Sequence, residues 1–263
     1  MKEYHIQLAK GDVGRYVLLP GDPARSALIA EYFDSPHQAA SNREFTTYTG
    51  ALDGVPVSVC STGIGSASTA IAVEELLKCG ADTFIRVGTC GGLDPTLRRG
   101  ELIVMQAAVR AEGTSKQYVP VEFPAVADTL VTTMLERACR ETTSRYRIGI
   151  TVSVDSFYSE IRPETIPIAQ EMEDAYEAWK RSGVIAAEME CGVLFPLAHI
   201  RGARAGALCV IVDEAEDETM PEQELLPVDR LLVTVTKALR NLISYDSAKE
   251  HSSLLSYRVP EGM

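Results

Sequence analysis

Short apolar stretches typical of β-strands alternate with helical stretches along almost the whole chain of 263 residues. Such alternation predicts an α/β fold, a three-layer α/β/α sandwich with helices on both sides of a central mixed β-sheet. The expected strands are Tyr16–Leu19, Phe45–Gly50, Val57–Cys60, Thr83–Val87, Leu102–Val109, Ile148–Val154 and Ala205–Val212. The expected helices are Pro23–Phe33, Ser68–Cys79, Val126–Cys139, Glu171–Ser182, Cys191–His199 and Val228–Ile243.

The composition of the chain limits its possible domain organisation, compartment and binding partners. No break in composition, repeat or linker divides the chain, so we expect one domain over residues 1–263, with a polar surface tail from about residue 246. No apolar run is long enough for a membrane span, and the N-terminus lacks an apolar signal region. The six cysteines have no CxxC spacing and predict a reduced compartment, the cytoplasm. A formal charge of −12 argues against a nucleic-acid partner, and the four histidines show no metal-ligand spacing.

The run Phe84–Gly92 is a short apolar strand that carries Arg86 near its carboxyl end and stops at a glycine-rich turn with a hydroxyl, Thr89. In an open α/β sheet, ligands bind outside the carboxyl ends of strands. A guanidinium, a hydroxyl and free backbone N–H groups together suit an anion of the size of phosphate. The alternative is a strand-to-loop junction whose arginine reaches solvent, and this run alone does not decide between the two.

A second strand end, Pro20–Arg25, repeats the combination of glycine and arginine. Gly21 permits a close approach that a side chain would block. Asp22 suits the N-cap of a helix and Pro23 its first position, so Arg25 falls in the first turn, where free N–H groups favour anions. Ordinary capping with a solvated arginine is the alternative. Two strand ends of this kind favour one shared anion site.

A third arginine, Arg43, precedes a hairpin pattern. The expected strands Phe45–Gly50 and Val57–Cys60 are separated by the turn dipeptide Asp53–Gly54. The second of these strands leads into Ser61–Gly65, another glycine-rich strand end in front of a helix.

Longer motifs surround these features. They are PGDPxR at Pro20–Arg25, REF at Arg43–Phe45, STGIG at Ser61–Gly65, RVGTCGG at Arg86–Gly92, EFPAVAD at Glu122–Asp128 and EMEC at Glu188–Cys191. In this order and spacing, the chain resembles the nucleoside phosphorylases of the trimeric/hexameric class, most closely the bacterial uridine phosphorylases, from His5 to about Ile243. The resemblance implies the same α/β sandwich and an enzyme that cleaves the C1′–N bond of a nucleoside with phosphate, leaving ribose 1-phosphate and the free base.

Phosphorolysis makes three physical demands. Phosphate must be held as the nucleophile, ribose must be oriented while positive charge grows on it, and the negative charge of the departing base must be stabilised. No covalent enzyme nucleophile, metal or organic cofactor is needed, and phosphate is a co-substrate. The resemblance assigns phosphate binding to Gly21, Arg25, Arg43, Arg86 and Thr89, with Arg43 donated across a dimer interface.

The motif Glu188–Cys191 is the candidate for ribose binding. One carboxylate with two acceptor oxygens matches two vicinal hydroxyls. From the residues alone, Glu190 could equally cap the helix that starts at Cys191. The resemblance assigns the ribose hydroxyls to Glu190, with Met189 packing on the sugar. It also assigns His5 to the ribose of a neighbouring subunit, whereas an isolated histidine near a terminus is usually solvated.

The base pocket departs from the family pattern. Uridine phosphorylases usually carry a Gln-x-Arg element shortly after a Phe-Tyr pair, whereas here Phe157 and Tyr158 are followed by Glu160 and Arg162. An ionised carboxylate only accepts hydrogen bonds, so Glu160 fits uracil N3–H or equally the N1–H and amino group of guanine. Phe157 is expected to stack on the base in either case. The expected base pocket also includes Cys90, Gly91 and Glu188.

Asp213 stands in a segment where uridine enzymes typically show Asn-Arg or Asn-Gln. It aligns with the aspartate that purine nucleoside phosphorylases use to protonate the purine. The alternative is that Asp213 and Glu214 end a strand in a solvated acidic loop. The expected catalytic residues are therefore Arg86, Glu190 and Asp213.

The sequence thus favours phosphate-dependent cleavage of uridine to uracil and ribose 1-phosphate. A phosphorylase for 6-oxopurine nucleosides, inosine or guanosine, is the close alternative, and a hydrolytic nucleosidase is the second, although hydrolysis needs no arginine-rich anion site. The resemblance further implies a homo-oligomer, a hexamer built as a trimer of dimers with shared sites, and no nucleic-acid or membrane partner. It implies a candidate K⁺ site at the dimer interface, around Glu44, Ile64 and Ser68.

Overall fold

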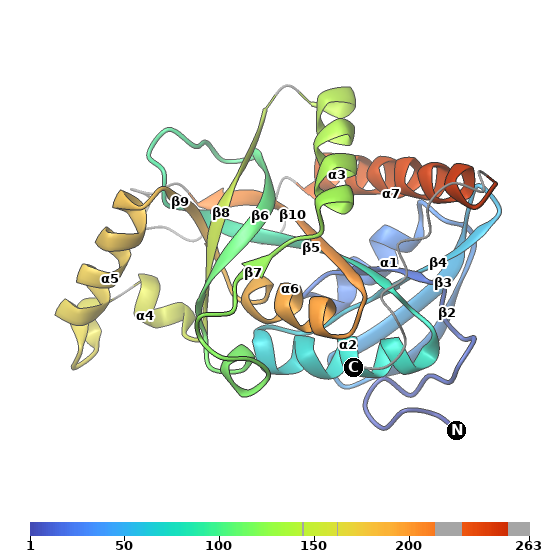
Figure 1. Cartoon of the computed structure of the whole chain (residues 1–263), viewed down its shortest axis with the longest axis horizontal. Helices are drawn as coiled ribbons and strands as arrows, with labels where there is room; N and C mark the ends of the chain where they lie inside the picture. Colours follow the sequence, from blue (N-terminus) through green and yellow to red (C-terminus); the bar gives the residue numbers. More distant parts are fainter. Residues whose placement is uncertain (144, 162, 214–227, 252–263) are drawn as a thin grey trace.

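A computed structural model describes residues 1–143, 145–161, 163–213 and 228–251. Within them, a ten-stranded mixed sheet is covered by helices on both sides (Figure 1). The strands are β1 (Tyr16–Leu19), β2 (Asp34–Asn42), β3 (Phe45–Leu52), β4 (Val55–Cys60), β5 (Thr83–Gly92), β6 (Leu102–Ala111), β7 (Ala125–Val126), β8 (Tyr146–Val154), β9 (Val184–Glu188) and β10 (Arg204–Asp213). The α-helices are α1 (Pro23–Ala30), α2 (Ser66–Cys79), α3 (Thr129–Thr142), α4 (Phe157–Ile161), α5 (Ala169–Arg181), α6 (Cys191–Ile200) and α7 (Val228–His251).

Two apolar cores lie on opposite faces of the sheet. One packs α2 and α6 against the strands and contains Leu76 and Phe195, both fully buried. The other packs α1, α3 and α7 against the opposite face and contains Leu135 and Leu239. Figure 1 shows α2 and α6 in the lower half of the view and α3 and α7 at the top. The expected three-layer α/β fold is confirmed. No helix in the described ranges combines the length and hydropathy needed to cross a membrane.

Part of the sheet closes on itself. β5 pairs in parallel with β10 and antiparallel with β9, and β10, β6, β8 and β9 follow one another in the sheet order. These five strands therefore form a ring, and β1, β4, β3 and β2 extend from β5 as an open sheet. β5 is the strand that joins the ring to the open sheet, so it pairs with strands of both parts.

β5 runs through the glycine-rich segment that we expected to be a turn, so that expectation is wrong. β1 pairs with β5 only as far as Arg86, and beyond it β5 continues beside β10 and β9 to Gly92. These glycines do not form a turn. They allow side chains to approach the strand closely. A Cβ at Gly88 would lie 2.8 Å from Cζ of Arg86, and one at Gly91 would lie 3.2 Å from both carboxylate oxygens of Asp213.

The polar tail expected from about residue 246 is also corrected by the structure, because α7 continues to His251. Asp246 anchors this last part of the helix. Its Oδ2 accepts a hydrogen bond of 2.7 Å from the hydroxyl of Tyr16 and lies 2.7 Å from Nη2 of Arg204. Those contacts join the helix to the first residues of β1 and β10. Residues 252–263 lie outside the described part of the chain.

Candidate active site

Arg86 lies at the centre of a buried cluster of charged side chains. Its own side chain is 7% exposed, Nε lies 2.8 Å from Oε2 of Glu188, and Nη2 lies 2.5 Å from Oε2 of Glu190. Burial alone would lower the pKa of Arg86, but the charges of Glu190 and Glu188 outweigh it and hold that pKa well above its ordinary value. Arg86 is therefore a permanent cation inside the protein.

Arg25 lies beside Arg86 and has far fewer contacts. The residue is 8% exposed, and in the described part of the chain its guanidinium makes one hydrogen bond, 3.4 Å from Nη1 to the carbonyl oxygen of Val87. Burial lowers the pKa of Arg25, and the nearby Arg86 charge also acts to lower it. Asp22 caps the helix as expected, accepting from the N–H of Ala24 at 2.9 Å. Two neighbouring buried cations with spare donors form a site for an anion.

The carboxyl end of β1 brings the expected phosphate residues together. Leu19, the last residue of β1, pairs with Arg86, and Gly21 follows directly. A Cβ at Gly21 would lie 3.2 Å from the carbonyl oxygen of Gly63, so this loop packs against the loop before α2. Thr89 follows on β5, where it is half-buried and pairs with β10.

Glu190 stands at the N-cap position of α6, but its side chain does not cap that helix. Its Oε1 accepts the N–H of Gly65 at 2.6 Å, and its Oε2 faces Arg86. The capping alternative is therefore excluded by the side-chain direction. Burial raises the pKa of Glu190, and the opposing attraction of Arg86 does not cancel that rise. A carboxylate that lies between a cation and a helix N-terminus can accept hydrogen bonds from hydroxyl groups.

Glu188 performs the capping instead. Its carboxylate accepts the N–H groups of Glu190, at 2.9 Å, and Cys191, at 3.0 and 3.1 Å. Its side chain is 0% exposed, and its Oε2 lies 2.8 Å from Nε of Arg86. The expected role of Glu188 in base binding stays a prediction. Met189 between the two glutamates is half-buried, and its carbonyl oxygen accepts from Ser66 Oγ at 3.0 Å.

The residues expected to bind the base are only partly described. Phe157 opens α4, is 38% exposed, and packs edge-to-face on Tyr158 with ring centroids 5.5 Å apart. Residue 162 and the side chain of Glu160 fall in the parts of the chain that the structure does not describe. The expected hydrogen bonds from Glu160 and Arg162 to the base therefore remain predictions.

Asp213 and Cys90 lie on adjacent strands. Asp213 ends β10, is half-buried, and lies against Gly91, where an added Cβ would lie 3.2 Å from both carboxylate oxygens. Cys90 is buried and its Sγ points at the carbonyl oxygen of Val210, 3.7 Å away. Burial raises the pKa of the Cys90 thiol well above its ordinary value, so this group is an inert neutral thiol.

His5 lies away from the charged cluster of its own chain. Its Nδ1 is 2.7 Å from Oε1 of Glu75, and the backbone N–H groups of His5 and Ile6 donate to the same carboxylate. Glu75 is ten residues along α2 from Gly65, the residue that contacts Glu190. At 1.5 Å per residue, this separation is about 15 Å along the helix axis.

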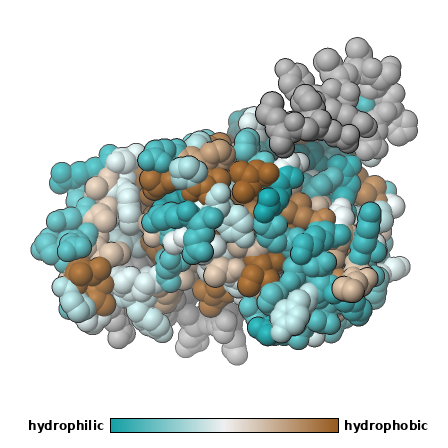
Figure 2. All heavy atoms as spheres, turned by 60° about the horizontal axis from the view of Figure 1, so that its bottom comes forward, coloured by the Kyte–Doolittle hydropathy of each residue, from teal (hydrophilic) through white to brown (hydrophobic). Residues whose placement is uncertain are grey.

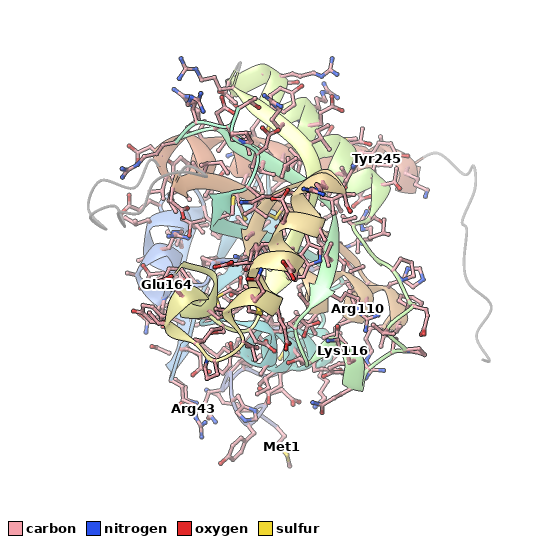
Figure 3. All side chains as sticks on the ribbon, turned by 90° about the vertical axis from the view of Figure 1, so that its left-hand side faces the viewer. Met1, Arg43, Arg110, Lys116, Glu164 and Tyr245 are labelled. Atoms are coloured by element: carbon pink, nitrogen blue, oxygen red, sulfur yellow. The ribbon has the colours of Figure 1, made fainter. Side chains whose placement is uncertain are left out.

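Arg43 also points away from that cluster. It is exposed at the tip of the hairpin between β2 and β3, with a φ of +55°. Figure 3 shows it at the rim of the molecule, at the same end as Met1. The neighbouring Asn42 donates from Nδ2 to the carbonyl oxygen of His5 at 2.7 Å, so the hairpin tip and the N-terminal segment form one surface.

Comparison with known proteins places the chain in a family. A family model described as the phosphorylase superfamily matches residues 15–244. The chain belongs to the phosphorylase superfamily. The uridine phosphorylase of Treponema pallidum (strain Nichols) is 43% identical over 249 residues, which cover 94% of this chain and 96% of that protein. The uridine phosphorylase of Thermococcus kodakarensis is 45% identical over 253 residues, 95% of this chain and 90% of that protein. A guanosine phosphorylase of Halorubrum lacusprofundi is 35% identical over 250 residues, 92% of this chain and 99% of that protein.

The residues expected at a K⁺ site of this phosphorylase superfamily member do come together. Ser68 Oγ donates to the carbonyl oxygen of Ile64 at 3.1 Å, and a Cβ at Gly63 would lie 2.8 Å from Cγ of Glu44 and 3.4 Å from that Oγ. Oxygen donors of this kind suit a hard cation. The described residues contain no cluster of three or more His, Cys, Asp or Glu side chains suited to a metal ion.

Two residues that contact the candidate site were not predicted from the sequence. The backbone N–H of Gly65 binds Glu190, and the hydroxyl of Ser153 on β8 donates to Glu188. Ser153 sits in the apolar run Ile150–Val154 without any motif around it. The one available signal was a serine on the inward face of a predicted core strand, because a buried hydroxyl needs a partner.

Proposed function

We propose that this protein is a uridine phosphorylase, which uses phosphate to convert uridine to uracil and ribose 1-phosphate. The observation that carries the proposal is the buried pair Arg25 and Arg86, with the carboxylate of Glu190 in contact with Arg86. This arrangement supports an anion and a sugar diol bound side by side. The uridine phosphorylases among the relatives support uridine as the nucleoside.

In the proposed reaction, an oxygen of phosphate forms a bond to C1′ of the ribose while the C1′–N1 bond breaks. The bonding electron pair leaves with uracil, which hydrogen bonds stabilise as an anion until it takes a proton. Arg25 and Arg86 neutralise and orient the phosphate. Glu190 accepts the two vicinal ribose hydroxyls, and its negative charge favours the oxocarbenium-like transition state. Every group in this scheme acts through charge and hydrogen bonds.

We further propose that His5 and Arg43 complete the site of a neighbouring subunit. The separation of about 15 Å between the His5 anchor and the Glu190 contact supports this, because an α-helix rises 1.5 Å per residue. Exposed apolar groups near these residues, Tyr4 at 71% and Ile64 at 78%, support a subunit contact there. Figure 2 views the side on which α2 lies and shows apolar residues interspersed with polar ones. The assembly proposed is a hexamer, a trimer of dimers, with Glu44, Ile64 and Ser68 as a candidate K⁺ site at the dimer interface.

The proposed compartment is the cytoplasm. All six cysteines are free and buried. Unpaired thiols in such number are typical of a reducing environment.

A second candidate activity is phosphorolysis of inosine or guanosine. It is favoured by Asp213, whose carboxylate lies against Gly91 at the end of β10, where an acid could protonate a purine. The guanosine phosphorylase among the relatives supports the same alternative. Asp213→Asn separates the two. It should leave uridine cleavage within about an order of magnitude and abolish purine nucleoside cleavage, because only a purine leaving group needs the proton.

The deciding experiment incubates the full chain with uridine, thymidine, inosine, guanosine, adenosine or cytidine, each with and without phosphate. Free base and ribose 1-phosphate are quantified by chromatography. The proposal expects uracil and ribose 1-phosphate in equal amounts, and only when phosphate is present. Base release that does not depend on phosphate would make the protein a nucleosidase. Preferred cleavage of inosine or guanosine would select the second candidate.

A further inference from the structure

The carboxylate of Glu188 meets donors from three elements of the fold. The hydroxyl of Ser153 on β8 donates to Oε1, and the N–H groups of Glu190 and Cys191 at the start of α6 donate at 2.9 to 3.1 Å. The fourth neighbour is Arg86 on β5, whose Nε lies 2.8 Å from Oε2. One carboxylate offers about four lone-pair sites. Hydrogen bonds from three groups and one ion pair therefore hold the Glu188 carboxylate in place.

Glu188 contacts the Arg86 guanidinium as an ion pair. Its Oε2 lies 2.8 Å from Nε, and Oε2 of Glu190 lies 2.5 Å from Nη2, although neither Nε of Arg86 nor Oε2 of Glu190 makes a hydrogen bond within the described residues. The two carboxylates therefore hold the guanidinium by charge, and they do not saturate its N–H groups. A guanidinium binds an oxyanion through its N–H groups, so a shift in its position changes phosphate affinity directly.

Ser153 determines how Glu188 itself is oriented. Its side chain is fully buried, and its Oγ accepts the N–H of Gly192 at 2.7 Å, which leaves the hydroxyl proton for Glu188. Glycine at position 192 permits this packing, because a Cβ there would lie 2.9 Å from the Cβ of Ser153. The register of β8 and β9 places Ser153 directly opposite Glu188.

We propose that Ser153 is a positioning residue for phosphate, acting through Glu188 to fix the position of the Arg86 guanidinium. The inference rests on the proposed function, since it takes Arg86 as a phosphate ligand. Without the hydroxyl, Oε1 of Glu188 loses its donor from β8, and the helix N-terminus is left as the source of hydrogen bonds to the carboxylate. The carboxylate, and with it the paired Arg86 guanidinium, is then held less firmly. Phosphate binding weakens, whereas uridine binding keeps its contacts.

The test measures initial rates of uracil formation by Ser153→Ala against phosphate and against uridine. We expect the KM for phosphate to rise about tenfold, the effect of one lost hydrogen bond to a charged group, and the KM for uridine to stay within twofold. Thr151→Val is the matched control. Thr151 lies two residues earlier on β8, is buried, and donates to the carbonyl oxygen of Ala186 on β9 at 2.9 Å. This control removes a buried hydroxyl between the same two strands without touching Glu188.

A double-mutant cycle shows whether Ser153 acts through Arg86. If it does, Ser153→Ala lowers kcat/KM for phosphate about tenfold in the wild-type background and less than twofold in Arg86→Ala. Ser153→Cys provides a second variant should the alanine variant fold poorly. A thiol is a weak donor, so its KM for phosphate should fall between those of wild type and Ser153→Ala.

Three results would overturn the inference. They are an unchanged phosphate KM in both Ser153 variants, an equal rise in Thr151→Val, or additive effects in the Arg86→Ala background. Failure of the proposed function looks different, because the wild-type protein would then form uracil without dependence on phosphate. Phosphate-induced stabilisation against heat gives the same comparison without any turnover, and it should be smaller in Ser153→Ala than in Thr151→Val.

Discussion

Charged clusters lie at the two ends of β1, and they differ in how fully their arginines are bonded. At the amino end, Arg204 binds both carboxylate oxygens of Asp246, at 3.0 and 2.7 Å, and donates to the hydroxyl of Thr83 from Nε and Nη2. At the carboxyl end, three residues or about 10 Å further along the strand, Arg25 makes one hydrogen bond of 3.4 Å in the described part of the chain. Both arginines are largely removed from water.

The difference distinguishes a cluster that the fold itself satisfies from a candidate binding site. Arg204 and Asp246 satisfy each other and join the end of α7 to the sheet, with Tyr16 as a third member whose pKa burial raises to about 12. Arg25 and Arg86 repel each other, and the spare donors of Arg25 have a cost in stability unless an anion arrives. Buried cations that the fold does not satisfy itself are a mark of a binding site.

The largest effect is expected at the carboxyl end of β1, where Arg25 has spare donors. Arg25→Ala should lower kcat/KM for phosphate by about 30- to 1000-fold, or 2–4 kcal/mol, because a charge-assisted contact to the phosphate is lost. The free energy of unfolding should change by less than about 1 kcal/mol, since one long hydrogen bond is removed along with a repulsion. Initial rates and urea unfolding measure the two quantities. A normal phosphate dependence in this variant would remove Arg25 from the site.

At the amino end of β1, where the arginine is fully bonded, we expect a large loss of stability and a small loss of activity. Arg204→Ala should lower the free energy of unfolding by about 2–3 kcal/mol, because Asp246 is left in a mostly buried position without its cation. The value of kcat/KM should stay within about twofold, as no contact of the anion site is changed. Arg181→Ala is the control. This arginine is 78% exposed in an i,i+4 pair with Glu177, so its loss should cost less than about 0.5 kcal/mol. If Arg204→Ala lost activity but kept its stability, the distinction between the two clusters would be contradicted.

A smaller effect is expected from acid. Burial on its own would raise the pKa of Asp246, but hydrogen bonds from Arg204 and Tyr16 outweigh it, and the pKa lies below its ordinary value. A carboxyl whose pKa is lowered by folding stabilises the fold above its unfolded pKa, about 3.9, and loses that contribution as the pH falls through the folded value. The stability difference between wild type and Asp246→Asn should therefore be constant near neutral pH and shrink below about pH 4. Unfolding in urea across this range measures it, and a constant difference would contradict the assignment.

The sequence predicted the candidate site at the carboxyl end of β1 better than the cluster at its amino end. Glycine and arginine at two strand ends were enough to bring Arg25 and Arg86 together, because carboxyl ends of parallel strands meet at one edge of a sheet. No comparable pattern marks Asp246, which was placed in a polar tail because it follows the last apolar positions of α7. Its role depends on Arg204 and Tyr16, which are distant in sequence.

Two of the three strands that were not predicted, β2 and β9, have a physical reason. β2 (Asp34–Asn42) contains no β-branched or large apolar residue and is mostly exposed, so it forms only through its pairing with β3. β9 (Val184–Glu188) is five residues long and gains its place from the ring of strands. The continuation of β5 through Gly88 and Gly91 differs from the predicted turn, because glycine is used both in tight turns and at close approaches. Closure of the ring depends on pairing between strands that are distant in sequence, and no local sequence pattern predicts such pairing.

Phosphate-induced stabilisation tests the division of the two clusters most directly. Melting curves of the wild type, Arg25→Ala and Arg204→Ala are recorded with and without saturating phosphate, since a ligand that binds only the folded state raises the melting temperature. The account predicts that phosphate raises the melting temperature of the wild type and of Arg204→Ala by the same amount, although Arg204→Ala starts lower, and that it has no effect on Arg25→Ala. An undiminished phosphate response in Arg25→Ala, or its loss in Arg204→Ala, would contradict the account.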